Sequence, residues 1–188
     1  MEYNEVSGNL VTLAKEGRFD VIAHGCNCFC RMKRGLAPAL AEAFKCDSFP
    51  LERTKEYSVN EYGDTTYYET GNEGNINKLG QIDYEQVTFN TRTGNKIAAY
   101  TLPKPDFLLT FIVVNAYTQY HWDTSTKPFD YDAFKLCMRK MNKIFKGKHI
   151  GLPQIGAHLA GGDWEKIKPI IQKELKDCKV TVVIWDGK

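Results

Sequence analysis

The sequence predicts an α/β protein, a three-layer α/β/α sandwich on a mixed, mostly parallel sheet. Near-continuous apolar runs at Phe19–Ala23 and Phe107–Ala116 are typical of strands that are covered on both faces. Strand-like and helix-like segments alternate through the second half of the chain, as far as Trp185. This alternation favours parallel strands joined by helices that pack on both faces of the sheet.

Length and composition indicate one domain that spans residues 1–188. Of the 188 residues, 43% are hydrophobic and 26% are charged. This is enough chain for one substantial core, and the composition is that of an ordinary soluble protein. The formal net charge of +2 gives no general affinity for polyanions, so nucleic acid is not indicated as a partner.

The start of the chain and its cysteines predict a cytoplasmic protein. Met1–Glu5 has neither the basic start nor the apolar stretch of a signal peptide, and no apolar run approaches membrane-spanning length. The six cysteines are therefore expected to be free thiols in a reducing compartment. We expect a monomer that does not associate with membranes.

The first quarter of the chain predicts two strands and two helices in alternation. Tyr3–Val6 alternates weakly and should form a short edge strand. Leu10–Lys15 has helical spacing and is followed by a Glu-Gly pair that ends it. After the strand at Phe19–Ala23, the Ala- and Leu-rich segment Leu36–Phe44 predicts a helix, with Pro38 in its first turn, where proline is tolerated.

A polar insertion is expected around residues 57–100. Its first part is rich in turn residues. Leu79–Phe89 and Lys96–Leu102 carry β-branched and aromatic residues on either side of Thr93–Asn95, which predicts a hairpin. We interpret the insertion as a surface elaboration at one edge of the domain.

The second half predicts three further strands and two helices. After the strand at Phe107–Ala116, Tyr131–Phe145 has helical spacing, His149–Ile155 reads as a strand, Trp164–Leu175 as a helix and Lys179–Trp185 as a closing strand. The apolar stripe of the first of these helices predicts core packing and consists of Phe134, Cys137, Met138, Met141 and Phe145. Pro169 in the second helix predicts a kink or a shorter helix.

Two strand–loop–helix corners with glycine at the turn predict a ligand site. The first runs through Phe19–Asn27 into the basic loop Cys30–Ala37, and the second is Ile150–Trp164. Glycine lets the backbone approach a ligand, and N–H groups at a helix start attract anions. Two such corners in one short α/β chain indicate a diphosphate ligand at the carboxyl ends of the strands.

Four motifs in the same order resemble those of the macro domain, the ADP-ribose-binding α/β fold. They are Gly8–Leu10, Asp20–Asn27, Met32–Ala37 and Leu152–Gly156. His24 and Asn27, combined with Leu159–Trp164, are most similar to the yeast-type ADP-ribose 1''-phosphate phosphatase branch. The resemblance implies a domain that binds ADP-ribose and hydrolyses its 1''-phosphate.

The resemblance also implies roles for residues of the first corner. Asn9 would accept a hydrogen bond from the adenine amino group, Asn27 would hold the distal ribose, and His24 would act as general acid or base. Without the resemblance, Asn9 is interpreted as a helix cap and Asn27 as a turn residue. His24 is then a strand histidine whose ring nitrogens have hydrogen-bond partners within the protein. Lys33 and Arg34, with Arg31, either clamp a terminal phosphate or form a solvated basic loop.

In the second corner, the backbone N–H groups of Ile155–Leu159 should face the diphosphate. His158 would either reach the distal phosphate as a weaker catalytic candidate or point to solvent. Asp163 reads first as a helix cap and only secondarily as a catalytic group. The full set of expected ligand-binding residues is Asn9, Leu10, Gly25, Asn27, Lys33, Arg34, Gly35, Leu36, Ala37, Gln154, Ile155, Gly156, Ala157, His158 and Leu159.

Two alternatives to the phosphatase stay open. A non-catalytic ADP-ribose reader would have the same cleft without turnover. A glycohydrolase that removes ADP-ribose from modified protein or nucleic acid is disfavoured by Gln119 and Ala160, which stand where that branch of the family has its catalytic groups. No cofactor is expected, and no metal either, because the Cys26–Cys30 Cys-x-Cys-x-Cys run lacks a second ligand pair with zinc spacing.

Overall fold

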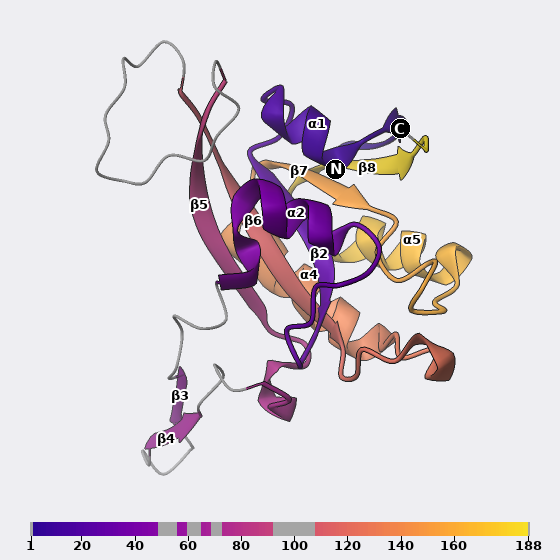
Figure 1. The fold of residues 1–188 in the computed structure, drawn as a ribbon. Helices are drawn as coiled ribbons and strands as arrows, with labels where there is room; N and C mark the ends of the chain where they lie inside the picture. The colour runs from indigo at the N-terminus through magenta and orange to yellow at the C-terminus, as the bar shows by residue number, and fades with distance from the viewer. Residues whose placement is uncertain (1, 49–55, 60–64, 69–72, 92–107, 188) are drawn as a thin grey trace.

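The computed structural model describes residues 2–48, 56–59, 65–68, 73–91 and 108–187 (Figure 1). These residues form a six-stranded sheet in the order β1-β8-β7-β2-β6-β5 and a separate two-stranded ribbon. The strands of the main sheet are β1 (Glu2–Gly8), β2 (Val21–Asn27), β5 (Ile82–Asn90), β6 (Leu108–Gln119), β7 (His149–Pro153) and β8 (Lys179–Trp185). The ribbon pairs β3 (Glu56–Val59) with β4 (Thr65–Tyr68) in antiparallel fashion.

The main sheet is mixed and mostly parallel, as expected. Every neighbouring pair is parallel except β5 and β6, which run antiparallel. Because β1, β8, β7, β2 and β6 run in the same direction, the carboxyl ends of these five strands lie at one edge of the sheet. β1 lies at one side of the sheet, which confirms the edge strand expected near Tyr3–Val6.

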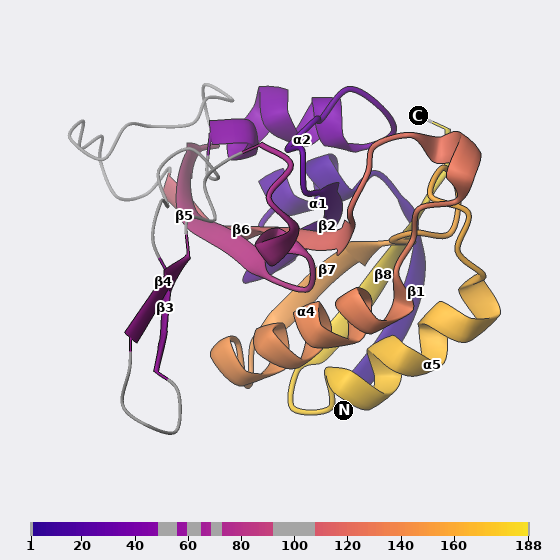
Figure 2. The same ribbon diagram turned by 90° about the horizontal axis from the view of Figure 1, so that it is seen from below.

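Helices cover both faces of this sheet, and the three layers are visible when the molecule is viewed from below (Figure 2). One face carries α1 (Leu10–Lys15) and α2 (Ala37–Phe44), and the other carries α4 (Tyr131–Ile144) and α5 (Trp164–Glu174). In the described segments, short 3₁₀ turns join the elements: η1 (Cys46–Ser48), η2 (Ile76–Lys78) and η4 (Thr124–Thr126). The predicted α/β/α sandwich is confirmed.

Two apolar clusters hold the layers together, one on each face of the sheet. The cluster beneath α4 and α5 includes the expected stripe of Phe134, Cys137, Met138, Met141 and Phe145, all buried. The cluster beneath α1 and α2 is built around Leu10, Leu40, Phe44 and Phe111. The sheet is thus buried on both sides, as the apolar runs of its central strands predict.

Several element boundaries differ from those predicted. β2 begins at Val21 and continues to Asn27, and β6 continues to Gln119, so both strands run further into polar sequence. α5 passes through Pro169 without ending there, so the expected shortening at this proline is wrong. β5 pairs with β6, whereas the hairpin expected at Thr93–Asn95 lies outside the described residues.

Two further properties concern the cysteines and the helices. All six cysteines lie in described segments, and all six are free thiols. No helix in the described part of the chain is long and apolar enough to span a membrane.

Candidate functional site

A cavity of about 1040 Å³ opens at the carboxyl edge of the parallel strands. It is lined by residues that end β1, β2, β6, β7 and β8, among them Gly8, Asn27, Gln119, Pro153 and Trp185. Ligands of open α/β sheets bind outside the carboxyl ends of the strands, where loops from neighbouring strands meet. The volume is suited to a ligand of nucleotide size.

The first glycine corner forms one wall of this cavity. Gly35 has a φ of +64°, a left-handed conformation that favours glycine. It leads into α2, whose N-terminus has no side-chain cap and carries Pro38 in its first turn. Leu36 and Ala37 line the cavity at this point, so the uncapped end of α2, with its partial positive charge, lies at the cavity wall.

The second corner forms the opposite wall. Gly156 has a φ of +79°, and a Cβ atom there would lie 2.3 Å from the ring of Phe129. The Gly162 N–H donates to the Gly156 carbonyl at 2.8 Å, which closes the loop on itself. Leu159 reaches across to the first corner, because a Cβ on Gly35 would lie 3.4 Å from its Cδ1. The two corners therefore approach each other over the cavity.

Three cations border one end of the cavity. Arg31 lies 4.9 Å from the centroid of the Trp122 ring and forms an ion pair with Glu73 at 3.3 Å. Arg34 donates to the Thr124 hydroxyl at 3.2 Å, and Lys33 lies between the two arginines in the chain. Among the described residues that line the cavity, none is Asp or Glu. The cavity therefore favours an anionic ligand.

His24 is buried, with 2% of its surface exposed, although it reaches the cavity wall. The parallel register of β2 and β6 places it opposite Asn115, whose Oδ1 lies 2.7 Å from His24 Nε2. Because the Asn115 Nδ2 donates to the Cys46 carbonyl, Oδ1 is the acceptor and Nε2 carries the proton. Burial lowers the pKa of His24 to about 4, and the bond to Asn115 offsets only part of this effect. His24 is therefore neutral at pH 7.

The two asparagines expected to contact the ligand, Asn9 and Asn27, form hydrogen bonds with backbone groups of nearby residues. The Asn9 Oδ1 accepts hydrogen bonds from Val11 N and Thr12 N, so this oxygen caps α1. The Asn27 side chain both donates to Arg31 O and accepts from Arg31 N. A register shift between Cys26 and Asn27 releases Asn27 from the regular ladder and turns it toward this loop. Both asparagines nevertheless line the cavity.

The second corner brings one more titratable side chain to the cavity. His158 is exposed and lines it. Asp163 caps α5 through a bond from Glu165 N, as the sequence predicts. The N–H groups of Ile155 and Ala157 donate to Pro153 O and Gln154 O, so neither of these two expected donors faces a ligand.

The structure brings nearly all the expected ligand-binding residues together. Asn9, Leu10, Gly25, Asn27, Lys33, Arg34, Gly35, Leu36, Ala37, Gln154, Ile155, Gly156, His158 and Leu159 all line the cavity. Ala157 is not among these lining residues and packs against the core beneath α4 and α5.

Sequence reasoning missed part of the lining. The residues missed are Gly8, Ala39, Thr118, Trp122, Thr124, Pro153, Val183, Ile184 and Trp185. The convergence of strand ends could have found the missed residues at the ends of β1, β6, β7 and β8, and Trp122 shortly after β6. It could not have found Ala39, which lies within α2, nor Thr124, which belongs to η4.

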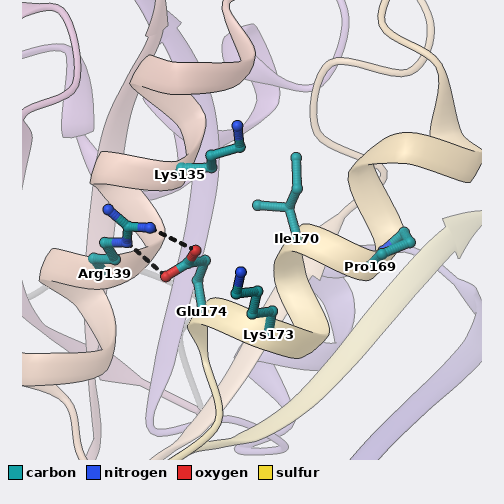
Figure 3. A pocket seen from close by; sticks show the side chains of 6 residues that line it. All are labelled: Lys135, Arg139, Pro169, Ile170, Lys173 and Glu174. Atoms are coloured by element: carbon teal, nitrogen blue, oxygen red, sulfur yellow. Dashed lines mark hydrogen bonds and ion pairs between the residues drawn. The ribbon is translucent and has the colours of Figure 1, made fainter.

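A second hollow of about 250 Å³ lies between α4 and α5 (Figure 3). Arg139 pairs there with Glu174 through two hydrogen bonds of 2.7 and 3.0 Å, which link the two helices. Lys135, Pro169, Ile170 and Lys173 complete its lining. Among the described residues, no three His, Cys, Asp or Glu side chains are grouped so that they could hold a metal ion.

Comparison with known proteins identifies the fold. No protein-family profile matches the chain. An uncharacterized protein from the tk-vs intergenic region of Enterobacteria phage T4 is 29% identical over 185 residues, which covers 96% of this chain and 95% of that protein. The macrodomain of Mycobacterium tuberculosis DarG is similar in structure, with a TM-score of 0.56 and 15% identity over 96% of both chains.

A Trypanosoma brucei macrodomain in complex with ADP-ribose is also similar, with a TM-score of 0.56 and 11% identity. The match covers 98% of this chain and 63% of that one. These identities are low, so the likeness concerns the fold. The chain has the macrodomain fold, as its sequence motifs imply.

Proposed function

We propose that this protein binds ADP-ribose in the large cavity and hydrolyses ADP-ribose 1''-phosphate. The observation that carries the proposal is a nucleotide-sized cavity between two glycine corners, lined by three cations and, among its described lining residues, by no carboxylate. A diphosphate with a further terminal phosphate is the ligand that this charge distribution favours. The ADP-ribose complex of the similar Trypanosoma brucei macrodomain supports the same ligand.

The lining residues suggest how the ligand lies. Asn9, Leu10 and Trp185 border one end and would receive adenosine. The uncapped start of α2 and the backbone of the second corner would receive the diphosphate. Asn27 would contact the distal ribose, which leaves the 1''-phosphate beside the cations Arg31, Lys33 and Arg34.

Hydrolysis at this phosphate requires charge neutralisation and proton transfer. A water oxygen forms a bond to phosphorus while the bond from phosphorus to ribose O1'' breaks, and O1'' leaves with a proton. The three cations would stabilise the charge on the phosphoryl oxygens. His158 is the better candidate for the proton, because its imidazole is exposed and lines the cavity. Because His24 is buried and bonded to Asn115, we assign to His24 the role of orienting the groups around the phosphate rather than of transferring the proton.

Phosphorus NMR of ADP-ribose 1''-phosphate mixed with the protein tests binding and turnover together. We expect an inorganic-phosphate resonance to grow with the wild-type protein. It should grow more slowly with His158→Ala and with the double variant that combines Lys33→Gln and Arg34→Gln. A control variant, Lys173→Gln, lies at the hollow between α4 and α5 and should turn over normally. Turnover that is unchanged in both cavity variants would contradict the proposed mechanism.

A non-catalytic reader is the second candidate. It is favoured by the neutral, buried state of His24, the residue to which the sequence resemblance gave the chemistry. A reader would shift or broaden the diphosphate resonances of ADP-ribose 1''-phosphate without releasing phosphate. That result would overturn the phosphatase and leave the binding proposal in place.

A further inference from the structure

A lysine is buried beneath the first corner. Lys78 ends the turn η2, and 1% of its surface is exposed. Its ammonium lies 5.5 Å from the centroid of the Tyr117 ring and has no hydrogen-bond partner among the described residues. A buried ammonium without a partner is costly, so this position favours a negative charge beside it.

Among the described residues, no neighbouring group pairs directly with this ammonium. The carboxylate of Asp83 lies in the same cluster, but it accepts a hydrogen bond from the Tyr117 hydroxyl at 2.6 Å. The thiols of Cys28 and Cys30 lie close enough for the Lys78 ammonium to act on both. Burial raises the pKa of both thiols, and Lys78 opposes this rise only in part. Both thiols are therefore protonated near pH 7.

Of the six cysteines, Cys30 is the one that is half-exposed, and the other five are buried. Its Sγ lies 3.9 Å from the Tyr117 hydroxyl, within the same cluster as Lys78. An oxidant in solution can therefore reach Cys30 first. The Lys78 ammonium and the Cys30 thiol both lie beside the Tyr117 side chain, so the ammonium is placed to balance an anionic product.

We propose that Cys30 is a site of oxidation by peroxides, and that Lys78 is the built-in counter-ion of the oxidised side chain. The Cys30 thiolate attacks one peroxide oxygen, a sulfur–oxygen bond forms, and the oxygen–oxygen bond breaks. Sulfur is oxidised to sulfenic acid, and hydrogen peroxide is reduced to hydroxide. The hydroxide then takes the sulfenic proton to give water and a sulfenate, whose oxygen pairs with the Lys78 ammonium.

The modified residue is directly connected to the ligand cavity. The Cys30 N–H donates to Asn27 O, so Cys30 closes the turn that carries Asn27, and its own φ is +55°. The next residue, Arg31, holds the Asn27 side chain through two backbone hydrogen bonds. An oxygen added at Cys30 must therefore alter the turn that supports both of these cavity residues.

The charged groups that face Cys30 predict the pH dependence of the reaction. Lys78 favours the thiolate, whereas Asp83 and Glu73 oppose it. Because burial outweighs the effect of Lys78 and raises the pKa, the thiolate is a minor species at pH 7. Oxidation should therefore be slow at pH 7 and accelerate with pH, about tenfold per unit while the thiol stays mostly protonated.

Dimedone trapping with peptide mass spectrometry locates the oxidised cysteine. The full-length reduced protein is treated with hydrogen peroxide and dimedone, which reacts with sulfenic acids. We expect labelling concentrated at Cys30 and clearly reduced in Lys78→Met, because loss of the ammonium raises the thiol pKa further. The surface control Lys148→Met should label like the wild type. Labelling spread evenly over the cysteines, or undiminished in Lys78→Met, would overturn the proposal.

A second pair of variants tests the counter-ion without oxidation and remains informative if Lys78→Met does not fold. Cys30→Asp places a permanent anion beside Lys78, and Cys30→Asn is its neutral match. Both residues tolerate the left-handed backbone at this position. We expect Cys30→Asp to melt about 2–4 °C above Cys30→Asn. An equal or lower melting temperature for Cys30→Asp would mean that Lys78 is not available to an anion at position 30.

Discussion

Gly156 is the residue of the second corner that least tolerates a side chain. Its φ of +79° disfavours any L side chain, and a Cβ would lie 2.3 Å from Phe129. Gly147 has nearly the same φ, +78°, but nothing lies within 4 Å of an added Cβ. The two positions therefore separate backbone strain from steric overlap.

We predict that Gly156→Ala lowers the free energy of unfolding by about 2 kcal/mol more than Gly147→Ala does, because overpacking adds to the backbone strain that both variants share. Urea denaturation of the two variants and the wild type measures the difference. Equal losses would mean that Phe129 moves aside at little cost. Gly156→Ala should also weaken ADP-ribose binding, since the corner lines the cavity.

The protonation of His24 gives a second prediction. In the unfolded chain its imidazole titrates near 6.5, whereas in the folded protein burial lowers the pKa to about 4. As the pH falls through this window, the unfolded state takes up the proton first, so the stability fully present above pH 6.5 is lost progressively down to pH 4. The loss attributable to His24 between pH 7.5 and pH 4.5 is about 2–3 kcal/mol.

Urea unfolding of the wild type and His24→Gln at several pH values measures this term. Glutamine can still donate a hydrogen bond toward Asn115, but it does not titrate. We expect the variant to lose less stability than the wild type on acidification. Parallel pH profiles for the two proteins would show that His24 does not remain neutral in the folded state.

At the scale of elements, α5 contains a position at which a substitution should stabilise the protein. Pro169 is exposed in the sixth position of the helix Trp164–Glu174, where proline removes a backbone donor and crowds the preceding turn. We predict that Pro169→Ala raises the free energy of unfolding by about 1–3 kcal/mol. Chemical denaturation measures the change. Gln172→Ala, at another exposed position of the same helix, should change stability by less than about 0.5 kcal/mol.

The sequence predicted elements well where local pattern and tertiary pairing agree. β8 spans Lys179–Trp185, the bounds predicted from its β-branched run Val180–Ile184, and α1 ends just before the Glu-Gly pair. β2 was placed correctly but its expected end came too early, because Gly25 and Asn27 are residue types typical of turns. Pairing with β6 keeps them in the strand, and a single sequence does not contain that pairing. The antiparallel partner of β5 was missed for the same reason.

The candidate site was predictable in its two corners and less so between them. Glycines at strand ends identify Gly35 and Gly156 from local sequence alone. Thr124 and Trp122 reach the cavity because the segment after β6 folds back toward the first corner, where Arg34 and Arg31 contact them. Such contacts depend on loop geometry, which has no periodic signal in sequence.

At the scale of the whole molecule, charge is distributed unevenly although the net charge is only +2. Arg31, Lys33 and Arg34 gather at one end of the cavity, and Lys135, Arg139 and Lys173 gather at the separate hollow between α4 and α5. In the second group, Arg139 pairs with Glu174 and Lys135 pairs with Asp132. In the first group, an ion pair joins Arg31 to Glu73. The first group therefore offers the stronger local attraction for an anionic ligand.

The concentration of cations at the large cavity leads to a prediction for ligand binding by the intact protein. ADP-ribose at a hundred times its dissociation constant should raise the free energy of unfolding by about 2.7 kcal/mol. For a chain of this size, that gain raises the melting temperature by about 5–10 °C. The shift should shrink as salt is added, because the exposed cations of the cavity contribute electrostatic attraction that salt screens. Differential scanning fluorimetry over a ligand and salt series measures both effects.

Lys33→Gln should reduce the shift in melting temperature that ADP-ribose causes, whereas Lys173→Gln, at the other group of cations, should leave it unchanged. An equal reduction in the two variants would mean that overall charge, rather than the cavity, determines ligand binding.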